Sequence, residues 1–409
     1  MKPIYQWIPL LLPALFASGL SAQGQGKAPN KEIQNLKKAM EQLREETDQA
    51  LEEMENRLLK EGQEIGKLRP GATRFLFSGY SSFRFTDEEG SPSTFDATFN
   101  PIVLFKFKDN LFFEGEVEFE LADASTPGEP EFETEAGLEY AHMVWAPRDE
   151  VMFGVGKFLL PFGQFTERVH PAWINKLPDK PLIFSHSGFI PEADVGIDVR
   201  GALPVMQRAS VNYALYLTNG PQLDTTTGEI ATGSPSDNNH NKTLGGRIGF
   251  LPIPSLEVGF SFMTGKAGFT TSSGTTSLDT LLLGVDVAFT RSFDQIKGTI
   301  DARAEWAMSD IDSNSAVIGG ADNSRDGWYA QVSYRADKME SLLKNLEWVL
   351  RYDTLSNPAS LNSDRSRLTL GVNYWIGNST VVKMAYQFDD RDNSAAETDA
   401  FLFQVGMGF

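Results

Sequence analysis

The feature that most constrains this chain is an alternation of side-chain character with a period of two residues. In residues 113–121, Phe, Gly, Val, Phe and Leu alternate with Glu114, Glu116, Glu118 and Glu120. Successive side chains of a strand point to opposite faces, so this segment has one apolar face and one row of carboxylates. A soluble sandwich can contain one such strand, and the fold argument therefore depends on repetition.

Similar segments recur as far as the C-terminus. They lie at about 73–85, 97–108, 111–121, 132–145, 150–158, 193–202, 208–218, 242–251, 255–264, 279–290, 296–307, 327–336, 346–354, 367–376, 379–388 and 400–409. This is an even number of segments, most of them near the roughly ten residues that a tilted membrane strand needs. Short connections (108–110, 252–254, 377–378) and long ones (219–241, 309–326, 389–398) are typical of the two sides of such a sheet.

Lipid offers no partner to an unpaired strand edge, so a sheet of this kind must close on itself. We therefore predict an all-β fold over residues 72–409, a 16-stranded antiparallel transmembrane β-barrel whose first strand pairs with its last. In the last segment, Phe401, Phe403, Val405, Met407 and Phe409 share one face. A terminal aromatic of this kind resembles the signal that barrel-assembly machinery recognises, and this resemblance makes that machinery an expected partner through Phe409.

Composition excludes several classes of function. The chain has 36 Lys and Arg against 55 Asp and Glu, a formal charge of −19, which is unsuited to nucleic-acid binding. It has no Cys and only four His, and we predict neither a cofactor nor a metal site. His142 falls on the expected lipid face, while His170, His186 and His240 fall in loops; none accompanies a nucleophile motif, so we do not expect an enzyme.

The N-terminal region contains an expected targeting signal and an expected helical segment. Residues 1–22 resemble a secretory signal peptide: Lys2 precedes an apolar stretch and a small-residue cleavage site. A membrane anchor is the alternative, but the stretch is short and contains two prolines. Residues 31–68 show apolar positions at alternating spacings of three and four, which predicts a periplasmic coiled-coil stalk. A lone solvated helix is the alternative for this segment.

If the apolar sets face lipid, the opposite parity faces the lumen. The predicted pore-lining cations are Arg200, Arg247, Arg303, Arg335, Arg351, Arg367 and Lys383. The predicted pore-lining acids are Glu114, Glu116, Glu118, Glu120, Glu135 and Glu139. Opposed acidic and basic walls would create a transverse field that orients dipolar solutes. The alternative is that these charges are screened and lie away from any constriction.

Residues 159–190 lack strand alternation and contain four prolines with the basic residues Arg168, His170, Lys176 and Lys180. A loop this long is usually functional. We expect it to fold inward as a constriction loop, with an external cap or a subunit contact as the alternatives.

Three segments resemble a known family. Residues 156–163 (GKFLLPFG), which end one strand and open the long loop, are similar to the Gly-x-Phe-x-x-Pro-Phe pattern of the phosphate-selective porin O and P family. Residues 194–201 and 213–220 are similar to the two strands that follow in that family. The resemblance implies a homotrimeric pore of the bacterial outer membrane, in which Arg303, Arg335, Arg351 and Arg367 could form part of a basic ladder. The Glu114–Glu120 row opposes a simple transfer of phosphate selectivity.

These observations predict an outer-membrane porin, a homotrimer among outer-membrane lipids. It would be a passive diffusion channel for small hydrophilic solutes or ions such as phosphate, with anion or phosphate preference left open. The alternative is an envelope tether, in which the stalk engages the cell wall and the barrel serves mainly as an anchor.

Overall fold

The computed structural model describes residues 74–123, 132–148, 150–185, 188–206, 208–272, 274–358, 364–392 and 398–409. The predicted signal peptide (1–22) and coiled-coil stalk (31–68) lie outside these residues. None of the helices in the described part of the chain is long and apolar enough to span a membrane.

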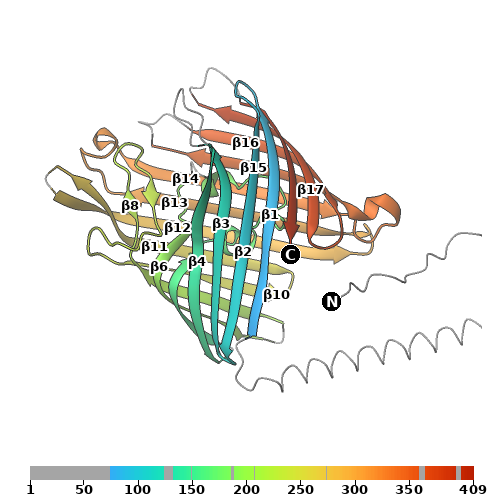
Figure 1. The fold of residues 1–409 in the computed structure, drawn as a ribbon, viewed down its shortest axis with the longest axis horizontal. Helices are drawn as coiled ribbons and strands as arrows, with labels where there is room; N and C mark the ends of the chain where they lie inside the picture. The colour runs from blue at the N-terminus through green and yellow to red at the C-terminus, as the bar shows by residue number, and fades with distance from the viewer. Residues whose placement is uncertain are drawn as a thin grey trace, which may run out of the picture. The chain divides into compact units, whose positions relative to one another are not determined.

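The described chain forms one closed sheet. The barrel has sixteen strands, β1–β7 and β10–β18, and each strand pairs antiparallel with the next barrel strand along the chain, β7 with β10 included. The sheet closes because β1 pairs with β18 as well as with β2. Figure 1 shows the first strand (blue) beside the last strands (red). The 16-stranded antiparallel barrel that the alternation predicts is therefore confirmed, with every predicted segment at its place in the order.

The barrel strands are β1 (Arg74–Glu88), β2 (Thr94–Lys108), β3 (Leu111–Asp123), β4 (Phe132–Arg148), β5 (Val151–Leu159), β6 (Ala193–Pro204), β7 (Ser210–Thr218), β10 (Thr243–Ile253), β11 (Leu256–Thr271), β12 (Gly274–Phe293), β13 (Gly298–Ile311), β14 (Asn323–Arg335), β15 (Leu346–Ser356), β16 (Arg365–Trp375), β17 (Thr380–Arg391) and β18 (Ala400–Gly408). The short helices are α2 (Phe165–Arg168), η1 (Leu182–Phe184), η2 (Ile318–Gly320) and η3 (Ser341–Asn345).

One long connection has structure that the sequence did not indicate. Between β7 and β10 the chain forms the small hairpin β8 (Gln222–Leu223) and β9 (Ile230–Ala231). β11 and β12 also run beyond their predicted ends, to the turn between Thr271 and Gly274. The inward side chains of this extension pack with the hairpin in an apolar cluster that includes Leu223, Phe269 and Leu278.

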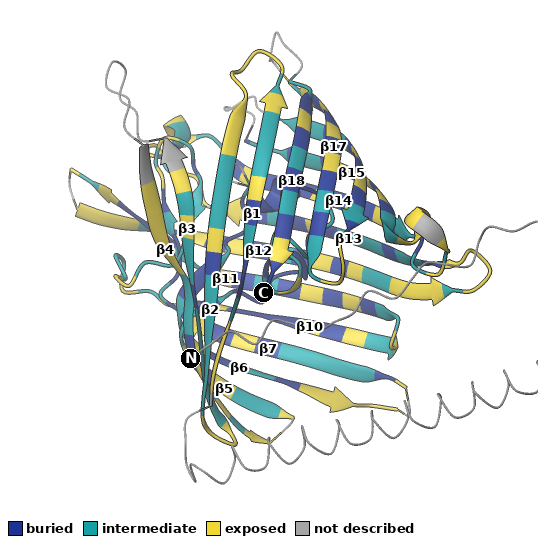
Figure 2. Ribbon diagram, turned by 45° about the vertical axis from the view of Figure 1, so that its right-hand side comes forward, coloured by how far each residue is buried: buried dark blue, intermediate teal, exposed yellow. Residues whose placement is uncertain are grey.

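The two faces of the wall have opposite chemistry. Along β15, Leu350 (43%) and Tyr352 (39%) are exposed outside, whereas Val349 and Arg351 are buried inside. Figure 2 shows the same alternation of buried and exposed residues along β17 and its neighbours. The charged parity thus faces the interior and the apolar parity faces outward, as expected of a sheet with different media on its two sides.

Backbone hydrogen bonds join the C-terminal residue to the first strand. The Gly79 amide donates to the Phe409 carbonyl (3.1 Å), and the Phe409 amide donates to the Gly79 carbonyl (2.9 Å). The Phe409 ring stacks outside against Phe77 and Phe99, with centroids 6.1 and 5.8 Å away. The outward face predicted for the last strand is confirmed, while recognition of Phe409 by assembly machinery stays a prediction.

The predicted orientation of His142 is wrong. A β-bulge between β3 and β4 pairs Glu116 with Tyr140 but Val117 with Leu138, which leaves Glu139 as an extra residue. Such a bulge shifts the parity of all later side chains in the strand. His142 is therefore 2% exposed and faces the interior, where its Nε2 lies 2.7 Å from Asp198 Oδ1.

This outward face gives a direct stability prediction. Leu350→Arg places a charge on the apolar side, and we expect it to reduce the free energy of unfolding in lipid vesicles by about 2–4 kcal/mol. The matched control is Glu118→Arg, which places the same side chain on the inner wall. Urea unfolding measures both variants; equal losses would mean that the outer face does not contact hydrocarbon.

The lumen and its internal loop as the candidate functional site

The chain between β5 and β6 folds against the inner wall rather than outside it. At its start, the Gly163 amide donates to Ser261 Oγ of β11 (3.0 Å), and the Gln164 amide donates to Glu305 Oε2 of β13 (3.0 Å). Gly163 has φ +66°, and a Cβ there would lie 1.9 Å from Glu305 Oε2. Only glycine therefore allows this turn and this close approach together.

An apolar cluster fixes the loop to the wall. Phe165 and η1, with Ile183 and Phe184, are almost fully buried against residues of the strands that include Met263 and Tyr329. Burial of each large apolar side chain contributes about 1.5–3 kcal/mol, so a loop with these residues is strongly driven out of water. The inner wall supplies the apolar surface that the loop needs.

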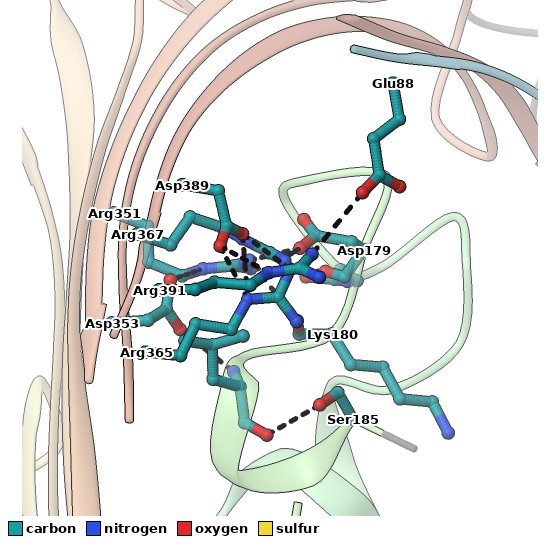
Figure 3. A network of polar contacts seen from close by, with 12 residues as sticks. Glu88, Asp179, Lys180, Ser185, Arg351, Asp353, Arg365, Arg367, Asp389 and Arg391 are labelled. Atoms are coloured by element: carbon teal, nitrogen blue, oxygen red, sulfur yellow. Dashed lines mark hydrogen bonds and ion pairs between the residues drawn. The ribbon is translucent and has the colours of Figure 1, made fainter. Parts of the chain in front are cut away.

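Charged contacts hold the far part of the loop. Asp179 Oδ2 accepts from Arg351 Nη2 and from Arg367 Nη1, each at 2.7 Å. The Arg351 Nε also donates to Asp353 Oδ2 (2.7 Å), and Asp353 Oδ1 accepts from the Leu182 amide (3.2 Å). Figure 3 shows this network, in which one loop carboxylate bridges two arginines from neighbouring strands.

The network continues along the wall toward the strand ends. Asp389 of β17 accepts from Arg367 Nε (2.6 Å), Arg365 Nη2 (2.6 Å) and Arg391 Nε (3.2 Å). Arg391 also lies 3.4 Å from Glu88 of β1. Four arginines thus meet four carboxylates when Asp179 and Asp353 are included, so the arginines of β15–β17 carry little uncompensated charge.

The pKa of Asp179 depends on two opposing effects, burial of the carboxylate and the charges of the neighbouring arginines. Burial of Asp179 favours the neutral acid, but Arg351 and then Arg367 outweigh it and lower the pKa below the ordinary 3.8. A lowered pKa in the folded state contributes stability above pH 3.8, and that stability is lost as pH falls through the lowered value. The contact is therefore retained throughout the neutral and mildly acidic range.

Most of the other predicted cations are also paired. Arg247 contacts Asp286 (2.6 Å), Arg200 contacts Glu167 (2.9 Å) and Arg303 contacts Asp301 (2.9 Å). In the loop, Arg168 contacts Glu257 (2.7 Å), Lys176 contacts Glu347 (2.6 Å), Lys180 contacts Glu192, and His170 donates to the Thr166 carbonyl. Lys383 donates to Gln404 Oε1 (2.9 Å) and the Ala172 carbonyl, while Arg335 lies over Trp375.

The predicted acids have a different environment. One inward row of β3 consists of Glu114, Glu116, Glu118 and Glu120, and the neighbouring strand β4 carries Glu135 and Glu139. Glu116 accepts from Asn100 Nδ2 (3.2 Å), and Glu114 lies 3.5 Å from His142 Nδ1. Among the described residues, no ion pair within 4 Å engages Glu118 or Glu139.

Three cavities border the loop on this side of the lumen, and two of them also border the acidic row. One of about 430 Å³ is lined by Glu114, Glu116 and His170, and one of about 390 Å³ is lined by Glu118, Glu139 and again His170. A third, of about 200 Å³, shares Arg168 and Arg200 with the first. These cavities are therefore lined mainly by β1–β7 and the loop, and the second one also borders Arg367 of β16.

Sequence reasoning found the inward cations but missed their partners. Four pairs have an acid and an arginine two residues apart and in contact: Asp198 with Arg200, Asp301 with Arg303, Arg351 with Asp353, and Asp389 with Arg391. Residues at i and i+2 share one face of a strand about 7 Å apart, which two long side chains can span. This spacing is a readable signal of internal neutralisation, whereas no local pattern indicates Asp179.

Comparison with solved structures finds the same fold in proteins of the bacterial outer membrane. The trimer form of OmpT, an outer membrane protein of Vibrio cholerae, is similar with a TM-score of 0.52 and 14% identity over 83% of this chain and 100% of that one. An anion-selective porin from Comamonas acidovorans is similar with a TM-score of 0.50 and 10% identity, with the same coverage of both chains. No protein-family model and no curated protein sequence matches the chain. At these identities the likeness concerns the fold, and the resemblance to the porin O and P family stays a prediction.

The Asp179 contacts predict how firmly the loop is held. Asp179→Asn leaves Arg351 and Arg367 buried without this counterion, and breaking such a pair costs about 3–5 kcal/mol. We expect trypsin to cleave faster after Lys176 in detergent-solubilised protein, measured by mass spectrometry of the fragments. The matched control, Glu192→Gln, breaks the half-exposed pair with Lys180 (41% exposed on each side) and should change cleavage little. Unchanged cleavage in Asp179→Asn would contradict the role of this carboxylate as the anchor.

Proposed function

We propose that this protein is an outer-membrane porin, a passive diffusion channel for small hydrophilic solutes or ions. The observation that carries the proposal is the combination of a closed barrel, an apolar outer face and a charged interior with adjoining cavities beside the loop. The loop 159–190 is the constriction in this proposal, because it occupies one side of the lumen and leaves the acidic side open. The proposed mechanism is size exclusion with electrostatic selection, without covalent chemistry.

The charge pattern supports a preference for cations along this path. Arg351 and Arg367, which a basic ladder would require, are buried and paired with carboxylates, although Arg367 also borders the cavity of about 390 Å³. Glu118 and Glu139 line the open cavity without an ion pair among the described residues. An acidic lining raises the local concentration of cations and lowers that of anions. An anion or phosphate preference, which the sequence leaves open, is the alternative that the same measurement tests.

The location and assembly follow from this function. The proposed site of action is the bacterial outer membrane, reached through cleavage of the predicted signal peptide and insertion by assembly machinery. A homotrimer is supported by the trimer form of one similar structure. The envelope tether depends on the stalk alone and stays a prediction.

Channel recordings test the function. We expect purified full-length protein to insert into planar bilayers with conductance steps in groups of three, because each subunit of the proposed trimer holds its own pore. Absence of discrete steps, with correctly folded protein shown by its resistance to unfolding in detergent, would contradict the porin proposal.

The reversal potential in a salt gradient tests the selectivity. We expect cation preference in the wild type and a shift toward anions in Glu118→Gln/Glu139→Gln, since two carboxylates leave the path. The control Asp310→Asn removes the same kind of charge from an exposed position on β13 and should shift the potential less, because salt screens charges beyond about 8 Å. An anion-selective wild type would overturn the cation preference and favour the phosphate alternative.

A further inference from the structure

Arg335 differs from the other arginines of the predicted ladder. Arg303, Arg351 and Arg367 each have a carboxylate oxygen within 3 Å. Arg335 forms no hydrogen bond or ion pair with any residue that the structure describes, and its Nε is buried without a partner. Its guanidinium carbon lies instead over the ring of Trp375, 4.3 Å from the centroid.

The nearest candidate partners of Arg335 are engaged elsewhere. Glu347 lies directly opposite on β15, but its oxygens accept from Lys176 Nζ (2.6 Å) and Trp375 Nε1 (2.9 Å), among others. Asp337 has the spacing of the contacting pairs described above, but β14 ends at Arg335. Asp337 Oδ2 accepts from Thr299 Oγ1 instead (2.7 Å), and Asp337 Oδ1, which is buried without a hydrogen-bond partner, does not contact Arg335 in the described structure. The loop therefore neutralises the carboxylate that Arg335 would otherwise meet.

Arg335 lines a cavity of about 290 Å³ between the loop and β13–β16. Three cations, Arg335, Arg303 and Lys176, line this cavity against one carboxylate, Asp301. Arg303 uses Nε and Nη2 on Asp301, and no hydrogen bond in the described structure engages its Nη1. The remaining lining is mainly aromatic or aliphatic: Phe165, Val169, Trp173, Ile174, Pro181, Tyr329 and Trp375.

We propose that this cavity is a binding site for a small carboxylate that carries a flat apolar group. A guanidinium whose face is covered by an aromatic ring still presents its N–H donors at its edge, and these match the two oxygens of a carboxylate. The aromatic walls favour an apolar body over a strongly hydrated inorganic anion, whose desolvation they would not repay. This inference rests on the proposed porin function. It adds aromatic carboxylates as a class of solute that the channel binds, distinct from the cations that the acidic lining favours.

Equilibrium binding tests the site without requiring conduction. Isothermal titration of full-length protein in detergent with benzoate should show saturable binding, with much weaker binding of acetate, benzylamine and inorganic phosphate. Phosphate binding as tight as benzoate binding would overturn the assigned ligand class. Equal binding of benzylamine would overturn the role of the cations. Because this assay needs no current, a negative result here and a failure to form channels are separate outcomes.

Variants locate the binding. Arg335→Gln removes a charge-assisted pair of hydrogen bonds and should raise the benzoate dissociation constant about tenfold or more. The matched control Arg84→Gln changes an inward arginine of β1 that pairs with Asp96 (2.7 Å) and lines a different cavity, and it should change binding less than about twofold, since no part of the site is removed. Trp375→Leu should weaken benzoate more than acetate.

Two further results would overturn the proposal. Equal losses in Arg335→Gln and Arg84→Gln would show a general charge effect rather than a site. If Asp337→Asn bound benzoate severalfold more tightly, Asp337 would be an ion-pair partner of Arg335 in the free protein, contrary to the unpaired guanidinium described above. In planar bilayers, benzoate should also reduce the ionic current in a saturable manner, and Arg335→Gln should require about tenfold more benzoate for the same reduction.

Discussion

The hydrogen bonds between β1 and β18 are the constraint on which the rest of this structure depends. Hydrocarbon offers no partner to a backbone N–H or C=O, so a sheet in the proposed membrane setting is stable only when its first and last strands meet. The register from Tyr80–Gly408 to Glu88–Ala400 provides that seam. Closure also creates an interior, and the interior in turn allows charged side chains to occupy every second position of the wall.

That interior holds many more charges than a soluble core would tolerate, and two devices compensate for them. Carboxylates and arginines two residues apart neutralise each other on one strand, as with Arg351 and Asp353. The loop then supplies Asp179 across two strands and covers the pair with an apolar cluster. On the acidic side of the lumen neither device operates on Glu118 and Glu139, and these two carboxylates line a cavity.

The sequence was sufficient for the strands because period-two alternation is local and survives in nearly every segment. It failed wherever a long-range contact or a one-residue irregularity decided the outcome. His142 was misplaced because the bulge at Glu139 has no distinctive residue pattern. The inward parity of Arg351 was readable, but its engagement by Asp179, 172 positions away in the chain, was not. Likewise, the unpaired state of Arg335 follows from a contact between Lys176 and Glu347 that only the folded chain brings about.

The position of Asp179 has a consequence for the order of assembly. This carboxylate sits between β5 and β6, yet it needs arginines from β15 and β16, which are synthesised long afterwards. A barrel that closed with the loop left outside would lose the contacts of Asp179 with Arg351 and Arg367, and it would leave the apolar side chains of the loop in water, at about 1.5–3 kcal/mol for each large one. Entry of the loop is therefore coupled energetically to completion of the barrel, because a molecule with the loop outside lacks both the ion pairs of Asp179 and the apolar cluster.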